Sequence, residues 1–331
     1  MPYPYQKDYI TFLFQLLDEF ESSQGTSKKP GRPFVYENRS LICFFAIMII
    51  KRCFTFKAMY RWLVNHKEES VRLGFTAIPK RATLSRRYKA LYHVIQQLVP
   101  FITQWSSPLG EDFSTEVVYE DKSLFKAKGP VWHKKDMENN VVPKKLRDLD
   151  KDATWAKSAY HGWVFGYGLH TTCTSSGFPV LLEADTASVS EQEVMDRKEE
   201  AILSKNIGHL IGDDGYTSFQ RTKNYAQKGL LLITPALHAD GEEGKAYHQF
   251  IEQPSLKALL LKRKTAIEPV FDLVSGLLST ESNHKQIPVK GKLNVRSFLA
   301  FGVLLTQLAL LMNSIFGLSF HNISHMLSVF L

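Results

Sequence analysis

Cysteine is scarce in this sequence, with only Cys43, Cys53 and Cys173 in 331 residues. Three scattered thiols are too few for a disulfide framework and too far apart for a zinc site built on closely spaced ligand pairs. The opening sequence MPYPYQKDY also lacks the basic segment and the apolar stretch of a secretory signal peptide. We therefore interpret the cysteines as core thiols and expect a protein of the reducing cytoplasm.

Long uninterrupted apolar runs are also missing. Residues 41–50 are too few to cross a bilayer, which needs about 20 apolar residues. Residues 298–316 come close to that length, but Gln307 and Asn313 interrupt them. We expect a buried C-terminal helix that packs on a sheet and no membrane partner, with a membrane span as the alternative.

Acidic residues are under-represented at the start of the chain. Residues 1–110 hold 16 Lys and Arg against 7 Asp and Glu, whereas residues 111–331 hold 25 against 26. A basic segment beside a near-neutral one is typical of a polyanion-binding module attached to a second domain. We therefore predict a helical, basic DNA-binding region over residues 1–110 and a separate domain over residues 111–331.

The basic region begins with an apolar pattern at helical spacing over residues 9–21. A polar linker rich in Gly and Pro follows, over about residues 22–36. Its sequence KPGRP resembles the core of AT-hook peptides, in which an arginine, here Arg32, enters a narrow minor groove. A solvated linker is the plainer interpretation of the same five residues.

Further helices are expected at residues 41–50 and 56–64, and another helix begins near residue 80 with Thr83 as its cap. Two compact helices before a basic helix start match a helix-turn-helix DNA reader. A solvated basic face on a helical bundle is the alternative, but the charge excess favours DNA. The candidate DNA contacts here are Lys80, Arg81, Arg86 and Arg87.

The sequence pattern changes from residue 115, where β-branched and aromatic runs alternate with amphipathic stretches. The predicted elements are strands 115–120, 162–173 and 178–183, helix 188–203, a strand ending at Asp213, helix 217–227, strand 229–234 and a helical region 247–278. A basic, loop-like insert occupies residues 122–158. Three strands followed by helix-alternated strands are the element order of a ribonuclease-H-like domain, so we predict an α/β fold with a mixed sheet flanked by helices.

Residues 210–219, LIGDDGYTSF, lead a short apolar strand into two adjacent carboxylates. In open α/β sheets, sites lie outside the carboxyl ends of strands, so an acid at this position is a site candidate. An Asx-turn is the plain alternative. The spacing to Gly215-Tyr216 favours Asp213 over Asp214, and Tyr216 itself is expected in the core.

Two further acids occupy the other acidic positions of a ribonuclease-H-like fold: Asp121 after the first strand and Glu268 on a later helix. Glu120 is the alternative to Asp121, but strand alternation puts the two side chains on opposite faces. Three converging carboxylates can hold two Mg²⁺ or Mn²⁺ ions, which activate water and stabilise the leaving oxygen in phosphodiester cleavage. We interpret Glu183 and Asp185 as polar turn residues and His170 as a packed strand residue.

The chain resembles the DDE transposases of bacterial insertion sequences over about its whole length. The residues that carry the resemblance are Tyr119–Ser123 (YEDKS), Gly212–Tyr216 (GDDGY) and Arg263–Phe271 (RKTAIEPVF), supported by Trp163–His170 (WVFGYGLH), Gly31–Pro33 (GRP) and Thr83–Arg87 (TLSRR). The resemblance implies a ribonuclease-H-like catalytic domain with Asp121, Asp213 and Glu268 as catalytic and metal-binding residues.

The same resemblance implies an enzyme that binds the terminal inverted repeats of its element, cuts there and joins the ends to target DNA, as a homodimer on double-stranded DNA. The basic insert would line the active site, and the implied contacts from it and from the third motif are Trp132, Lys134, Lys135, Trp155 and Lys264. The two tryptophans are candidates to stack on unpaired bases, with a core role as the alternative. Other functions left open are a non-transposing nuclease of the same fold and a catalytically decayed DNA-binding protein.

The third motif departs from the Tyr–Arg–Glu–Lys signature of one branch of the family. The corresponding positions hold Leu261, Lys264 and Ser275, so only the positive charge one turn before Glu268 is kept. Proline disfavours the helical conformation of the residue before it. With Pro269 next in the chain, Glu268 is expected at a kink or at a helix start.

Overall fold

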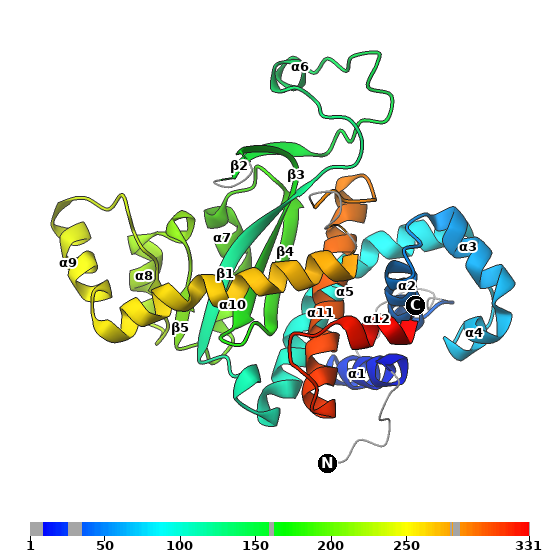
Figure 1. Cartoon of the computed structure of the whole chain (residues 1–331), viewed down its shortest axis with the longest axis horizontal. Coiled ribbons are helices and arrows are strands. Elements are labelled where there is room, and N and C mark those ends of the chain that lie inside the picture. Colours follow the sequence, from blue (N-terminus) through cyan, green and yellow to red (C-terminus); the bar gives the residue numbers. More distant parts are fainter. Residues whose placement is uncertain (1–8, 26–34, 159–161, 279, 281–284, 331) are drawn as a thin grey trace.

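The computed structural model describes residues 9–25, 35–158, 162–278, 280 and 285–330 (Figure 1). Arg32 and the rest of the KPGRP sequence lie outside these residues. The strands are β1 (Val117–Lys126), β2 (Thr154–Ser158), β3 (Gly162–Thr174), β4 (Pro179–Thr186), β5 (His209–Ile211) and β6 (Leu231–Ile233). They form one mixed sheet in the order β2-β3-β1-β5-β6, in which β4 also pairs with β3.

Strand directions divide the sheet into two parts. β1, β3 and β4 pair antiparallel, and Gly177, with a φ of 81°, lies in the tight turn that joins β3 to β4. β5 and β6 run parallel to β1, because a helix lies between each of them and the preceding strand. The α/β prediction is confirmed, and this order with these directions is consistent with a ribonuclease-H-like arrangement.

The helices are α1 (Tyr9–Ser23), α2 (Asn38–Ile50), α3 (Phe56–Asn65), α4 (Lys67–Arg72), α5 (Arg81–Ser106), α6 (Lys134–Glu138), α7 (Glu191–Leu203), α8 (Phe219–Ala226), α9 (Gly241–Ile251), α10 (Pro254–Leu278), α11 (Lys292–Phe316) and α12 (Ser324–Phe330). Two layers of them sandwich the sheet. α5, α10 and α11 cover one face in a large core that includes Tyr119 and Leu169. α7 and α8 cover the other face in a smaller core that includes Val118 and Leu210.

The N-terminal helices share the large core with the sheet. Side chains of α1, α2 and α5 are buried together with those of α10 and α11, and α5 makes extensive contact with α11 and β4. The all-helical character predicted for this region agrees with the described residues, whereas the domain division near residue 110 stays a prediction. α5 begins at Arg81, so Thr83 is not its cap.

α11 is long and apolar enough to cross a membrane by length and composition, but 89% of its most apolar window is buried inside the protein. The amide nitrogens of its two polar interruptions are paired within the fold. Gln307 Nε2 donates to Val99 O at 2.9 Å and Pro179 O at 2.9 Å, and Asn313 Nδ2 donates to Phe320 O at 2.9 Å. The predicted buried C-terminal helix on the sheet is confirmed.

Gly302 marks the closest approach of α11 to α10, which predicts that Gly302→Ala destabilises the protein. A Cβ atom there would lie 2.7 Å from Leu278 Cδ1 and 3.0 Å from Val274 Cγ1. We expect overpacking to cost about 1–3 kcal/mol, more than the gain of up to about 1 kcal/mol from the helix propensity of alanine. Urea unfolding measures the change. Leu278→Ala should then lower the free energy of unfolding less in the Gly302→Ala background than in the wild type. Additive effects of the two substitutions on this free energy would contradict a contact between Leu278 and position 302.

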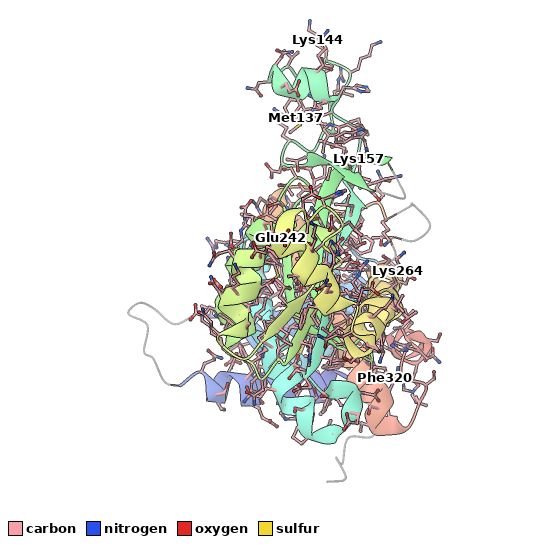
Figure 2. All side chains as sticks on the ribbon, turned by 90° about the vertical axis from the view of Figure 1, so that its left-hand side faces the viewer. Met137, Lys144, Lys157, Glu242, Lys264 and Phe320 are labelled. Atoms are coloured by element: carbon pink, nitrogen blue, oxygen red, sulfur yellow. The ribbon has the colours of Figure 1, made fainter. Side chains whose placement is uncertain are left out.

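The predicted insert is ordered at both ends. β1 continues to Lys126 and β2 begins at Thr154, so residues 122–126 and 154–158 belong to the sheet and only residues 127–153 project from it. We call residues 127–153 the arm. It carries α6 and extends far beyond the sheet, with Lys144 near its tip (Figures 1 and 2). The loop-like interpretation of the whole insert is therefore wrong at its ends.

Candidate active site

Asp121 lies on β1 and faces the large core. Its strand neighbours at alternate positions, Tyr119 and Phe125, are buried in that core under α10. Side chains two residues apart share a face of a sheet, so the carboxylate of Asp121 points toward α10. Glu120 points to the opposite face, as strand alternation predicted.

The parallel pairing of β1 with β5 places Asp213 beside Asp121. Tyr119 is paired with Ile211. Asp121 lies two residues further along β1, and Asp213 lies two residues after Ile211, just beyond the end of β5. Neighbouring strands lie about 4.8 Å apart. Because Tyr119 and Ile211 are buried in the large core, the residues two positions after them point to the same face of the sheet. The fold therefore brings together two carboxylates that are far apart in the sequence.

The turn after β5 separates the roles of its two aspartates. Asp213 Oδ1 accepts from Gly215 N at 3.0 Å, in a short turn that runs directly into the buried Tyr216. Asp214 Oδ1 accepts from Leu237 N at 2.7 Å and so fastens the loop after β6. This geometry supports Asp213 as the site residue and gives Asp214 a structural role.

Both site carboxylates have raised pKa values in the metal-free protein. Burial and the nearby charge of Asp121 raise the pKa of Asp213 to about 6. Burial also raises the pKa of Asp121, against the opposing effect of Arg263. Like charges held close together in a partly buried place disfavour ionisation of both, so the pair would gain from a bound cation.

Arg263 supplies the positive charge at this pair. It lies on α10, and its Nη1 donates to Asp121 Oδ2 at 2.5 Å. The sequence interpretation chose its neighbour Lys264, which is exposed. The apolar residues Ile267 and Val270 follow Arg263 at helical spacing and face the core, and this pattern was the signal that could have identified Arg263.

Glu268 is not brought to the two aspartates. α10 runs without a break through Pro269, and Glu268 lies on its exposed side. Its charge acts on Lys285, whose pKa burial lowers and whose Nζ donates to Ser123 Oγ at 3.0 Å. Glu268 is therefore not at a helix start, and the helical region predicted over 247–278 consists of two helices, α9 and α10.

Among the described residues, no group of three or more His, Cys, Asp or Glu side chains is placed to hold a metal ion. The pair of Asp121 and Asp213 nevertheless has suitable donors, because Mg²⁺ is commonly held by one or two carboxylates while water and substrate phosphate supply the other oxygens. Thr171 lies directly opposite Asp121, and within the described chain its buried Oγ1 has no hydrogen-bond partner.

Residues 134–287 match the family model of the transposase DDE domain. The chain carries a transposase DDE domain. The match includes Asp213 and Glu268 and begins after Asp121, and it confirms the resemblance over the matched residues. Neither the curated proteins nor the solved structures give a match to the chain.

Other acids of the sheet are engaged in structural ion pairs. Glu120 Oε2 accepts from Lys198 Nζ at 2.6 Å, and both side chains are buried between β1 and α7. Asp185 and Glu183 are buried on β4 and are not turn residues, which corrects the sequence interpretation. Arg197 bonds Asp185 at 2.7 Å and Arg296 bonds Glu183 at 3.2 Å. His170 and Tyr216 are buried as expected, and they bond each other at 3.1 Å.

Two predicted DNA contacts are unsuited to that role. Arg87 is buried and donates to Tyr36 O at 2.9 Å and Asn38 Oδ1 at 2.6 Å, so it ties α5 to the start of α2. Trp132 is only 5% exposed, and its Nε1 donates to Val141 O at 2.9 Å. Trp155 is half-buried against Phe165, which favours the core role for both tryptophans. The candidates on the surface are Lys80, Arg81, Arg86, Lys134, Lys135 and Lys264.

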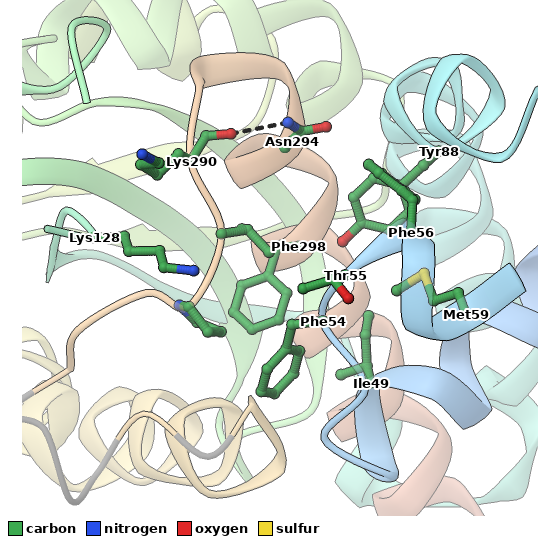
Figure 3. Close-up of a pocket in the computed structure, with 12 residues that line it drawn as sticks. Ile49, Phe54, Thr55, Phe56, Met59, Tyr88, Lys128, Lys290, Asn294 and Phe298 are labelled. Carbon is green, nitrogen blue, oxygen red and sulfur yellow. Dashed lines mark hydrogen bonds between the residues drawn. The ribbon is translucent and has the colours of Figure 1, made fainter. Parts of the chain in front are cut away.

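A separate apolar cavity of about 210 Å³ lies where the loop after α2 meets α5 and α11 (Figure 3). Phe54, Phe56 and Phe298 contribute to its walls, with Lys128 and Lys290 at its edge. No lining residue is a carboxylate. The cavity is therefore separate from the aspartate pair under α10.

The raised pKa of Asp213 predicts that Asp213→Asn stabilises the metal-free protein at pH 8 and loses this advantage near pH 4. The pKa is about 6 in the folded protein against an ordinary value of 3.8. Between these values the folded protein holds a proton that the unfolded chain has lost, so ionisation reduces stability as the pH rises. Urea unfolding at pH 4, 6 and 8 without divalent metal measures the effect. An effect independent of pH would contradict the assignment.

Proposed function

We propose that the protein is a DNA transposase that binds the terminal inverted repeats of its element, cleaves DNA there and transfers the cut strand to target DNA. The observation that carries the proposal is the convergence of Asp121, on β1, and Asp213, just after the adjacent strand β5, in a chain with a transposase DDE domain. The strand order supports a ribonuclease-H-like catalytic domain, with α7, α8 and α10 as its flanking helices.

In this proposal Asp121 and Asp213 hold Mg²⁺ or Mn²⁺. The bound metal would neutralise charge on the phosphoryl oxygens and lower the pKa of a bound water. Arg263 offsets the charge of the two carboxylates, and because arginine has five donors it can contact a phosphate oxygen while it stays bonded to Asp121. Glu268 remains the third acid, and the holder of a second ion, on the family resemblance alone.

The arm is proposed as a DNA-binding surface at a distance from the aspartate pair. Several of its acids are engaged with the body of the protein: Asp148 with Lys290, Asp150 with Tyr167, and Asp152 with the backbone N–H of Lys292. Its exposed basic residues are Lys134, Lys135, Lys144, Lys145, Arg147 and Lys151. The outer surface of the arm is thus biased toward positive charge, which favours contact with phosphates.

The experiment that tests the function uses a duplex carrying the element's own end, a second unrelated duplex and Mg²⁺ or Mn²⁺. Site-specific nicking followed by covalent joining of the nicked end to the second duplex is the expected result. Nicking without joining would indicate the non-transposing nuclease. Binding without nicking under both metals would indicate the decayed DNA-binding protein.

A further inference from the structure

We propose that Trp163, flanked by Lys134 and Lys157, is a stacking site for an unpaired nucleotide of DNA. The proposal rests on the proposed function only in taking DNA as the ligand. It assigns to Trp163 the role that the sequence interpretation gave to Trp132 and Trp155.

The exposure of Trp163 distinguishes it from the other tryptophans. Its side chain is 60% exposed at the beginning of β3, whereas Trp132 is buried and the remaining three tryptophans are half-buried. A single exposed apolar side chain is common on protein surfaces. Exposure of the indole alone therefore does not indicate a ligand, and a second observation is required.

Two lysines beside the indole provide that feature. Lys134 Nζ, from α6 of the arm, lies 5.5 Å from the centroid of the Trp163 ring. Lys157 on β2 is paired directly across from Trp163, so the two side chains are neighbours on one face of the sheet. An exposed aromatic ring with two lysines beside it combines a surface for a base with charges for the flanking phosphates.

The same face of the sheet carries the catalytic carboxylates. Thr171, on the strand of Trp163, is paired with Asp121. Trp163 lies an even number of residues before Thr171, and Phe165 and Leu169 between them are buried in the large core on that face. At about 3.3 Å per residue, the indole is roughly 26 Å from the carboxylates along β3, or about eight base-pair steps of 3.4 Å.

An unpaired nucleotide fits this site better than a paired one. Bases within a duplex stack on each other and offer no free face to a side chain, whereas an unpaired base exposes its ring. The site lies at the base of the arm, near Lys157 in Figure 2, beside the exposed lysines that would follow the continuing strand. One DNA strand could thus extend between the indole and the aspartate pair on a single face.

The test compares binding of a fluorescein-labelled single-stranded 20-mer with binding of the same sequence as a duplex. Trp163→Ala is expected to weaken single-strand binding roughly tenfold or more, because stacking on one aromatic contributes about 1–3 kcal/mol per base. Duplex affinity should change less than about twofold, and Trp163→Phe should recover part of the loss. Lys134→Ala with Lys157→Ala should weaken both ligands and reduce the salt dependence of binding.

Equal affinity of the wild type and Trp163→Ala for the single strand would overturn the proposal, as would an equal loss on both ligands. A circular-dichroism spectrum and a urea midpoint unchanged from the wild type establish that the variant is folded. Metal-dependent cleavage with unchanged single-strand affinity in Trp163→Ala would refute only this inference. Selective loss of single-strand binding in a protein that never cleaves DNA would refute only the transposase.

Discussion

Asp213→Asn is expected to reduce metal-dependent DNA cleavage by more than about a hundredfold, and Asp121→Asn is expected to do the same. Asp121 lies on β1 and Asp213 directly follows the adjacent strand β5, on the same face of the sheet. Loss of an outer partner of a metal ligand already costs about 10–100-fold, so loss of a ligand itself should cost more. The measurement is the initial rate of nicking of the element's end in saturating Mg²⁺.

Asp214→Asn is the matched control for this prediction. Asparagine keeps the oxygen that accepts from Leu237 N, so the loop after β6 should be unchanged. We expect near-normal cleavage by this variant, although it removes the same charge one residue away from Asp213. Equal losses in Asp213→Asn and Asp214→Asn would show that net charge, and not a specific ligand, determines the rate.

Lys198→Met is expected to destabilise the protein by about 3–5 kcal/mol, because removal of one partner leaves the other charge buried without compensation. Lys198 Nζ bonds Glu120 Oε2 at 2.6 Å and Thr172 Oγ1 at 2.7 Å, and both charged side chains are almost fully buried. The measurement is the free energy of unfolding from urea titration at pH 7.

The double variant Glu120→Met with Lys198→Met should recover most of this stability, because apolar residues of similar volume commonly replace a buried ion pair at little cost. It should also keep metal-dependent cleavage, since Glu120 faces α7 and not the aspartate pair. Cleavage lost in a folded double variant would make Glu120 a catalytic acid and would contradict the choice of Asp121.

The features that could be predicted from the sequence depend on local pattern. Strand alternation separates Asp121 from Glu120, and the apolar run before Asp213 places that acid at a strand end. The hairpin, the parallel strands and the buried C-terminal helix follow from the same kind of signal. The pairing of β1 with β5 then brings the two acids together, as the order of elements indicated.

The features that were missed depend on contacts between distant segments. Arg87 looks like a DNA contact beside Arg86. Only the fold shows that its guanidinium donates hydrogen bonds to Tyr36 and Asn38 at the start of α2. Trp132 lies in a basic insert, which suggests an exposed side chain, but it is buried in the fold. Trp163 has the pattern of an ordinary strand residue, but its side chain is exposed at the surface. The face of α10 that packs on the sheet could be predicted from the helical spacing of its apolar residues. That spacing places Arg263 toward the core and Glu268 toward solvent.

Manganese binding measured by electron paramagnetic resonance, with a duplex present, tests the central claim most directly. The account predicts that the wild-type protein and Asp214→Asn bind Mn²⁺ with similar affinity, and that Asp121→Asn and Asp213→Asn each lose the site. Equal binding of Mn²⁺ by all four proteins would contradict the assignment of the aspartate pair as the metal site.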